Sequence, residues 1–163
     1  MINELFARIE LQLLMNLTAR ALQLPTERIW TLSAVEALRA YATFTRRHLQ
    51  GTSSQERLSR LNQEAYRMGL RVRRWFPCKR EAAARRLLAM LYRHIGIDMQ
   101  FLPSGELCFH RCYFSRFYTP SVCIAASAID DGIIRGVMGQ TAGKLHFSQR
   151  ITEGCKCCMA TIK

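Results

Sequence analysis

Apolar residues in the first half of the chain recur every three or four positions, which is the spacing of one face of an α-helix. This pattern predicts four helices, over residues 2–23, 33–49, 53–77 and 79–94. Ser33-Ala-Val-Glu36 and Ser53-Ser-Gln-Glu56 fit the capping box, in which the serine and the glutamate each satisfy a free backbone N–H. The apolar face predicted for the first helix comprises Ile2, Leu5, Phe6, Ile9, Leu13 and Leu17.

After Gly96 the pattern changes to the alternation that is typical of strands. It predicts strands over residues 97–102, 106–113, 143–150 and 156–162, with a helix over residues 120–137 between the second and the third. The order β-β-α-β-β indicates an α+β fold, in which one helix lies across a small antiparallel sheet. We therefore divide the chain into a helical region, 1–96, and a cysteine-rich α+β unit, 97–163, and expect them to form one integrated domain.

The chain has 163 residues, of which 49% are hydrophobic and 22% charged, which is ordinary for a globular protein and argues against disorder. Its formal net charge is +12, and arginine supplies most of the excess. Arginine suits phosphate and carboxylate, so a nucleic acid or another acidic partner is one interpretation and solvated helix faces are the simpler one. No basic tract interleaved with aromatic residues accompanies the charge.

The N-terminal stretch lacks the basic region of a signal peptide, and no run of about 18 apolar residues is present. On these grounds we expect a cytoplasmic protein without a membrane span, and the sequence leaves a homo-oligomer open. In a reducing compartment, the seven cysteines are expected to be thiols, metal ligands or redox groups rather than structural disulfides.

Six of the seven cysteines lie in the last third of the chain, and this clustering makes that region the candidate site. Thiolates bind zinc and iron–sulfur clusters, so a metal or cluster centre is one alternative, although the spacings differ from those of zinc fingers and ferredoxins. Its ligands would be Cys108, Cys112, Cys123, Cys155, Cys157 and Cys158. Strand alternation puts Cys157 and Cys158 on opposite faces, and single cysteines also serve as small buried apolar residues.

Acid, base and thiol groups in the same region are candidates for catalysis. His110 lies two residues from both Cys108 and Cys112, so alternation places all three on one strand face, where a Cys–His pair would activate a thiolate. Asp130 follows Cys123 by about two helical turns, so the two share a helix face, and the carboxylate would act as general acid or base. A surface histidine and exposed carboxylates are the simpler interpretations.

The string Arg150-Ile-Thr-Glu-Gly154 places a guanidinium, a hydroxyl and a carboxylate at a turn between two predicted strands. Arg150 would bind a substrate carboxylate through two parallel hydrogen bonds. Thr152 would add a hydroxyl for binding, and Glu153 would add a second carboxylate. The same residues would alternatively do no more than cap the hairpin.

The last third of the chain resembles the aminothiazoline-carboxylate hydrolase-like family. The resemblance rests on Arg111-Cys112-Tyr113, on the helix with Cys123 and Asp130, and on Arg150-Ile-Thr-Glu-Gly154 followed by Cys157-Cys158. It implies hydrolysis of a small ring that contains sulfur and nitrogen and carries a carboxylate. The strand-helix-hairpin ending, with Gly132 and Gly136 on the helix, is also similar to the four-vinyl-reductase-type small-molecule-binding domain. This second resemblance implies that the chain binds a ligand and does not require that it catalyses a reaction.

These patterns together predict that the chain binds a small anionic molecule and hydrolyses a non-peptide C–N or C–S bond in it. The catalytic set would be Cys112, Cys123, Asp130 and Glu153, and the substrate-binding set would be Arg150, Thr152 and His110. The alternatives are a protein that binds a metal or an iron–sulfur cluster through its cysteines, and a small-molecule sensor without catalysis.

Overall fold

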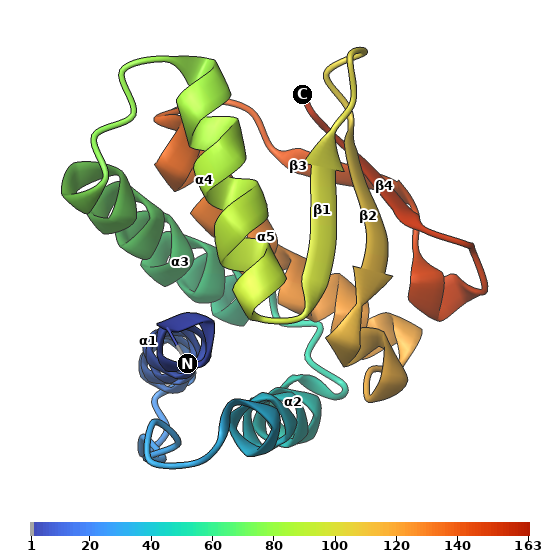
Figure 1. The fold of residues 1–163 in the computed structure, drawn as a ribbon. Coiled ribbons are helices and arrows are strands. Elements are labelled where there is room, and N and C mark those ends of the chain that lie inside the picture. Colours follow the sequence, from blue (N-terminus) through green and yellow to red (C-terminus); the bar gives the residue numbers. More distant parts are fainter. Residues whose placement is uncertain (1) are drawn as a thin grey trace.

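The structure, a computed structural model, places four helices before a small sheet and describes residues 2–163, apart from the side chain of Ile2. The helices are α1 (Ile2–Leu22), α2 (Ala34–Leu49), α3 (Gln55–Trp75) and α4 (Glu81–His94) (Figure 1). Then come strands β1 (Ile97–Phe101) and β2 (Leu107–Cys112), the 3₁₀ turn η1 (Tyr113–Arg116) and helix α5 (Pro120–Met138). The chain ends with β3 (Leu145–Gln149), the 3₁₀ turn η2 (Ile151–Glu153) and β4 (Cys158–Ile162). The predicted α+β fold is confirmed.

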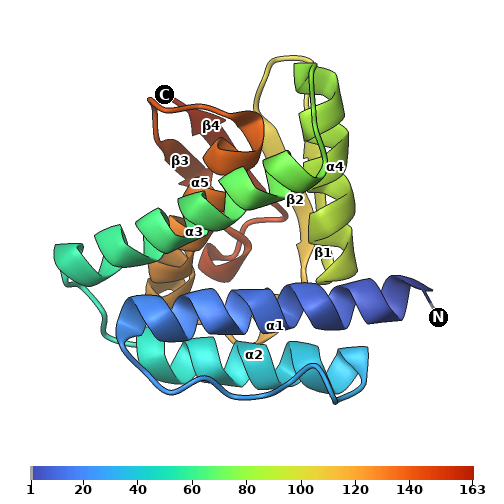
Figure 2. The same ribbon diagram turned by 90° about the vertical axis from the view of Figure 1, so that its left-hand side faces the viewer.

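The four strands form one antiparallel sheet in the order β1-β2-β4-β3, so the two predicted hairpins join through β2 and β4. Alternate residues of β2 and β4, among them Leu107, Phe109 and Ala160, are buried on the inner face of the sheet. Helix α5 lies across this face and α3 crosses α5 on its far side, while α1 and α2 lie side by side at one end (Figures 1 and 2). The core therefore runs through both regions of the chain.

The capping box predicted at Ser33 is confirmed, because the Ser33 hydroxyl accepts a hydrogen bond from the Glu36 N–H and the Glu36 carboxylate accepts one from the Ser33 N–H. The second predicted box is wrong. Helix α3 begins one residue later than its pattern requires, with Ser54 as the N-cap, so Glu56 no longer lies three residues beyond the cap. Ser54 makes no side-chain hydrogen bond to the start of the helix, so the paired serine and glutamate hydrogen bonds of a capping box are not formed.

The buried side of α1 differs from the predicted face. Leu11 and Met15 are fully buried, whereas Leu5, Phe6 and Ile9 are each about half exposed. The reason is that α2 and α3 pack against α1 and enclose its second half on several sides, which leaves the apolar side chains of its first two turns at the edge. Within residues 2–163, no helix has both the length and the apolar character that a membrane crossing requires.

Helices α3 and α5 touch through their backbones. A Cβ atom added to Gly132 would lie 2.4 Å from the Asn62 carbonyl oxygen, and one added to Gly136 would lie 2.5 Å from the Tyr66 carbonyl oxygen. Gly69 of α3 faces Gly136, and its added Cβ would lie 2.9 Å from the Gly136 Cα atom. Distances below 3.0 Å leave no room for a methyl group, so glycine permits this crossing.

We predict that Gly132→Ala and Gly136→Ala each lower the free energy of unfolding by about 1–3 kcal/mol, because the new methyl group forces the two helices apart. Urea denaturation followed by circular dichroism measures the change. Ser59→Ala, at an exposed position of α3, is the matched control and should change stability by less than about 0.5 kcal/mol. Wild-type stability in both glycine variants would contradict the close crossing.

Candidate functional site

An apolar cavity of about 130 Å³ lies between the helices and the inner face of the sheet unit. All five helices and strands β1 and β2 contribute to its wall, so the helical region and the α+β unit build it together. It is smaller than the roughly 300–1,000 Å³ of sites for drug-sized ligands, so only a small molecule fits. The polar residues of its wall are Glu10, Tyr41, Tyr92, Cys112, Tyr118, Cys123 and Asp130.

Asp130 projects from α5 into this wall and accepts a hydrogen bond from the Tyr92 hydroxyl at 2.9 Å. Burial raises the pKa of the Asp130 carboxyl from 3.8 to about 6, although the Tyr92 hydrogen bond and the positive charge of Arg150 oppose the rise. A carboxyl group with this pKa exists in both protonation states near neutral pH. It therefore has the property that a general acid or base needs.

Cys123 lies on the same side of α5 as Asp130, as the two-turn spacing predicted, and both line the cavity. Burial raises the pKa of the Cys123 thiol, and the negative charge of Asp130 adds to the rise. The Thr152 hydroxyl and the Arg150 guanidinium act in the opposite direction and lower this pKa. Cys123 is thus the thiol of the cavity wall that the Arg150–Gly154 segment contacts.

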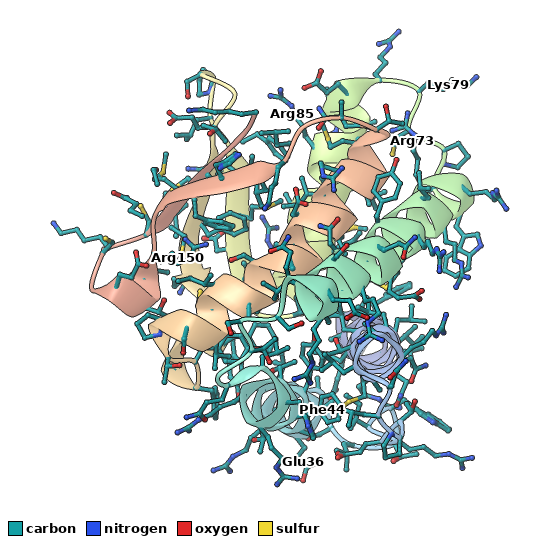
Figure 3. The ribbon with its side chains drawn as sticks, turned by 180° about the vertical axis from the view of Figure 1, so that it is seen from behind. Glu36, Phe44, Arg73, Lys79, Arg85 and Arg150 are labelled. Atoms are coloured by element: carbon teal, nitrogen blue, oxygen red, sulfur yellow. The ribbon has the colours of Figure 1, made fainter. Side chains whose placement is uncertain are left out.

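Arg150 leaves the end of β3 beside α5 (Figure 3). One of its terminal nitrogens donates to the Ser127 hydroxyl at 3.2 Å, and its guanidinium carbon lies 4.4 Å from the centre of the Phe147 ring. The Arg150 Nε and the Thr152 Oγ1 are buried and make no hydrogen bond of good geometry among residues 2–163, although the Thr152 hydroxyl lies close to the Cys123 thiol. Neither residue is among those that line the cavity. Because unpaired buried polar atoms are costly, these two atoms suit a polar ligand.

Cys158 lies on β4, near Cys123, Asp130 and Arg150. It is buried, and its sulfur accepts a hydrogen bond from the Ile151 N–H at 3.2 Å. Burial raises the pKa of its thiol to about 11, and the negative charge of Asp130 adds to the rise. Cys158 is therefore a neutral thiol that holds the turn against the sheet.

The prediction that Cys108, His110 and Cys112 share one strand face is wrong. The pairing of β1 with β2 shifts by one residue between Asp98 and Met99, and this bulge turns Cys112 toward the inner face. Burial and the Asp130 charge raise the pKa of the Cys112 thiol to about 12. Cys112 consequently meets Cys123 and Asp130 as a protonated group.

Cys108 and Cys157 lie on the outer face of the sheet. His110 is exposed there, and its Nδ1 atom lies 3.7 Å from the Cys108 sulfur. The Gln149 side chain donates to the Cys157 sulfur at 3.3 Å, and Cys155 lies in the turn that leads to β4. The cysteines therefore do not form one group, because Cys112, Cys123 and Cys158 lie on the inner side of the sheet and Cys108 and Cys157 on the outer side. In the described part of the chain, no three His, Cys, Asp or Glu side chains converge on a point where they would hold a metal ion.

Two other acids, Glu153 and Asp131, do not line the inner cavity. Glu153 is exposed on η2. Asp131 is 4% exposed and structural, because it forms an ion pair with Arg135 at 2.9 Å and accepts the Leu145 N–H at 2.7 Å. Asp131 therefore ties the start of β3 to α5.

Sequence reasoning missed four polar residues of the cavity wall, which are Glu10, Tyr41, Tyr92 and Tyr118. Tyr92 is part of the apolar face of α4, where its hydroxyl has no sequence signal. Glu10 pairs with His94 at 2.8 Å, and burial raises the pKa of its carboxyl to about 7 in spite of that pair. The position of Glu10 between apolar residues of α1 is the one feature of the sequence that could have indicated a buried acid.

Comparisons with protein-family models, with curated proteins and with solved structures gave no match to this chain. The geometry of the site is therefore the ground on which a function is inferred.

We predict that Asp130→Asn stabilises the protein relative to wild type progressively as the pH rises from about 4 to about 6. The folded-state pKa of Asp130 is raised, so below pH 4 the carboxyl is protonated in both states and costs nothing. Above pH 6 the folded protein must bury its charge, and the difference should reach about 3 kcal/mol. Urea denaturation at several pH values measures it, with Glu153→Gln as the exposed control. A difference independent of pH would contradict the burial of Asp130.

Proposed function

We propose that the chain is a hydrolase that acts on a small sulfur- and nitrogen-containing ring with a carboxylate substituent. The observation that carries this proposal is the unpartnered buried Nε of Arg150, which lies together with Thr152 beside the thiol of Cys123. A guanidinium with a free donor in a desolvated site favours a carboxylate. The resemblance of the last third of the chain to the aminothiazoline-carboxylate hydrolase-like family supports the same ligand.

The roles follow from the environment of each group. Arg150 binds the carboxylate of the ligand, and Thr152 donates or accepts a hydrogen bond next to it. Cys123 is favoured as the nucleophile over Cys112, because Arg150 and Thr152 lower the pKa of Cys123 whereas the pKa of Cys112 is about 12. Asp130, with a pKa of about 6, transfers the proton.

The proposed reaction adds one water molecule to the ring. The Cys123 sulfur forms a bond to the ring carbon that lies between sulfur and nitrogen, and the thiol proton passes through Asp130 to the ring nitrogen. The bond from this carbon to the ring sulfur then breaks as a C=N bond re-forms, and the nitrogen gives its proton through Asp130 to the sulfur, which leaves as a thiol. Water finally attacks the carbon, which releases the opened product and restores the Cys123 thiol.

One observation favours a second candidate, a small-molecule sensor that binds its ligand without turnover. Burial raises the pKa of all three inward thiols, Cys112, Cys123 and Cys158, which disfavours the thiolate form. A sensor would use the same Arg150 and Thr152 contacts and would need no thiolate. Binding alone therefore does not distinguish the two candidates, and turnover does.

We predict that the protein opens 2-amino-2-thiazoline-4-carboxylate, with release of a free thiol that a chromogenic disulfide reagent detects after removal of the protein. Cys123→Ser should abolish turnover, and Asp130→Asn should lower it by about 10²- to 10⁴-fold. Cys78→Ser removes a cysteine that lies away from the cavity and should leave turnover unchanged.

Calorimetric titration of the same compound separates binding from chemistry. Arg150→Met should weaken binding by about tenfold or more, because it removes the charge-assisted hydrogen bonds to the carboxylate. Binding without turnover would establish the sensor and overturn the hydrolase. Equal turnover in Cys123→Ser and Cys78→Ser would exclude a nucleophilic role for Cys123.

A further inference from the structure

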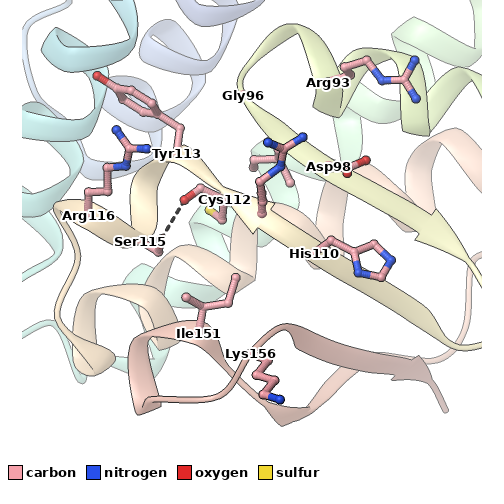
Figure 4. A pocket seen from close by; sticks show the side chains of 12 residues that line it. Arg93, Gly96, Asp98, His110, Cys112, Tyr113, Ser115, Arg116, Ile151 and Lys156 are labelled. Carbon is pink, nitrogen blue, oxygen red and sulfur yellow. Dashed lines mark hydrogen bonds between the residues drawn. The ribbon is translucent and has the colours of Figure 1, made fainter.

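A second and larger hollow, of about 680 Å³, opens on the surface where β1, β2, η1 and the turn before β4 come together. Its volume lies within the roughly 300–1,000 Å³ that small-molecule sites occupy. Its wall has a different character from that of the inner cavity, because charged side chains surround it (Figure 4). The basic residues of this wall are Arg93, His110, Arg111, Arg116 and Lys156.

Four separate elements bring these cations together. Arg93 lies in the last turn of α4, Arg111 on β2, Arg116 on η1, and Lys156 in the turn before β4. All four side chains are exposed. Since they come from different parts of the chain, the concentration of charge is a product of the fold and not of one basic stretch of sequence.

The charge of this hollow is scarcely compensated. Among residues 2–163, the salt bridges involve other cations, and none includes Arg93, Arg111, Arg116 or Lys156. The one acid in the wall is Asp98, which is the strand partner of Arg111 without forming a salt bridge to it. Like charges around a concave surface raise the local concentration of anions.

The lining also contains a flat apolar surface. The Tyr113 ring lies in the wall, and the guanidinium carbon of Arg116 is 6.0 Å from its centre. Gly96 forms the wall beside Tyr113, and a Cβ atom added to Gly96 would lie 2.9 Å from the Tyr113 Cβ atom. The Tyr113 ring also packs against Phe117, with 5.4 Å between ring centres, so it is a fixed apolar edge of the hollow beside the arginines.

We propose that this hollow binds a small molecule with several phosphate groups, such as a nucleoside triphosphate. Three guanidinium forks and one ammonium group match clustered phosphate oxygens better than a single carboxylate. A hollow of about 680 Å³ accommodates a compact ligand, whereas an extended nucleic-acid strand requires a groove that tracks its backbone. The site is distinct from the inner cavity, and the two adjoin at Ile97 and Cys112, which line both.

Calorimetric titration with ATP, inorganic tripolyphosphate and adenosine tests the proposal on the full chain. ATP and tripolyphosphate should each bind in a 1:1 ratio, and adenosine alone should not bind measurably. Arg111→Gln and Arg116→Gln should each weaken ATP binding by about tenfold, as expected for a lost charge-assisted hydrogen bond. Arg46→Gln removes the same charge from an exposed position of α2 and should leave the affinity within about twofold of wild type.

Three results would overturn the proposal. The first is no saturable binding of ATP or tripolyphosphate up to about 1 mM. The second is equal weakening by Arg46→Gln and Arg111→Gln, which would indicate diffuse attraction by the basic surface. The third is displacement of ATP by single-stranded RNA that binds more tightly and with a steep salt dependence, which would make nucleic acid the ligand. Cys123→Ser should retain ATP binding, so failure of the hydrolase proposal leaves this one testable.

Discussion

Two helix backbones are in contact where α3 crosses α5, and this contact fixes the helix that carries Cys123 and Asp130. Gly69, Gly132 and Gly136 leave no side chain between the helices, so α5 lies deep against the helical region. The same helix covers the inner face of the sheet (Figures 1 and 2). A wider crossing would move α5 toward the sheet or away from it, and Cys123 and Asp130 would move with it. Because protein interiors contain little free volume, a displacement of α5 would also displace the side chains that pack against it.

Burial by the helical region also determines the chemistry of the site. The carboxyl of Asp130 and the thiols of Cys112 and Cys123 depart from their ordinary pKa values chiefly because apolar side chains displace water around them. Arg150 and Thr152 enter from the other side, on the turn after β3, and oppose the effect of burial at Cys123. Helix α5 thus brings an acid and a thiol into a small apolar enclosure, and the turn after β3 brings a guanidinium close to that thiol from outside the cavity lining. That combination underlies the proposed hydrolase.

The sheet divides polar chemistry between its two sides. The wall of the inner cavity is mostly apolar and, within residues 2–163, contains no arginine or lysine, whereas the surface hollow at the end of β2 has four exposed cations and one acid. Ile97 and Cys112 border both spaces. A small neutral or carboxylate-bearing ring suits the first space, and a phosphate chain suits the second, because desolvation penalises multiple charges in the cavity. The two proposals therefore concern different ligands and different surfaces.

The sequence alone determined the elements and part of the inner site. Periodicity located the helices and strands within a few residues, and the spacing of two helical turns put Cys123 and Asp130 on one face. These features depend on local geometry, which repeats along the chain. The bulge that turns Cys112 inward, the buried side of α1 and the partnership of Tyr92 with Asp130 depend on which elements pack together. Only the tertiary structure decided them, because strand register and burial are set by contacts between residues that are distant in sequence.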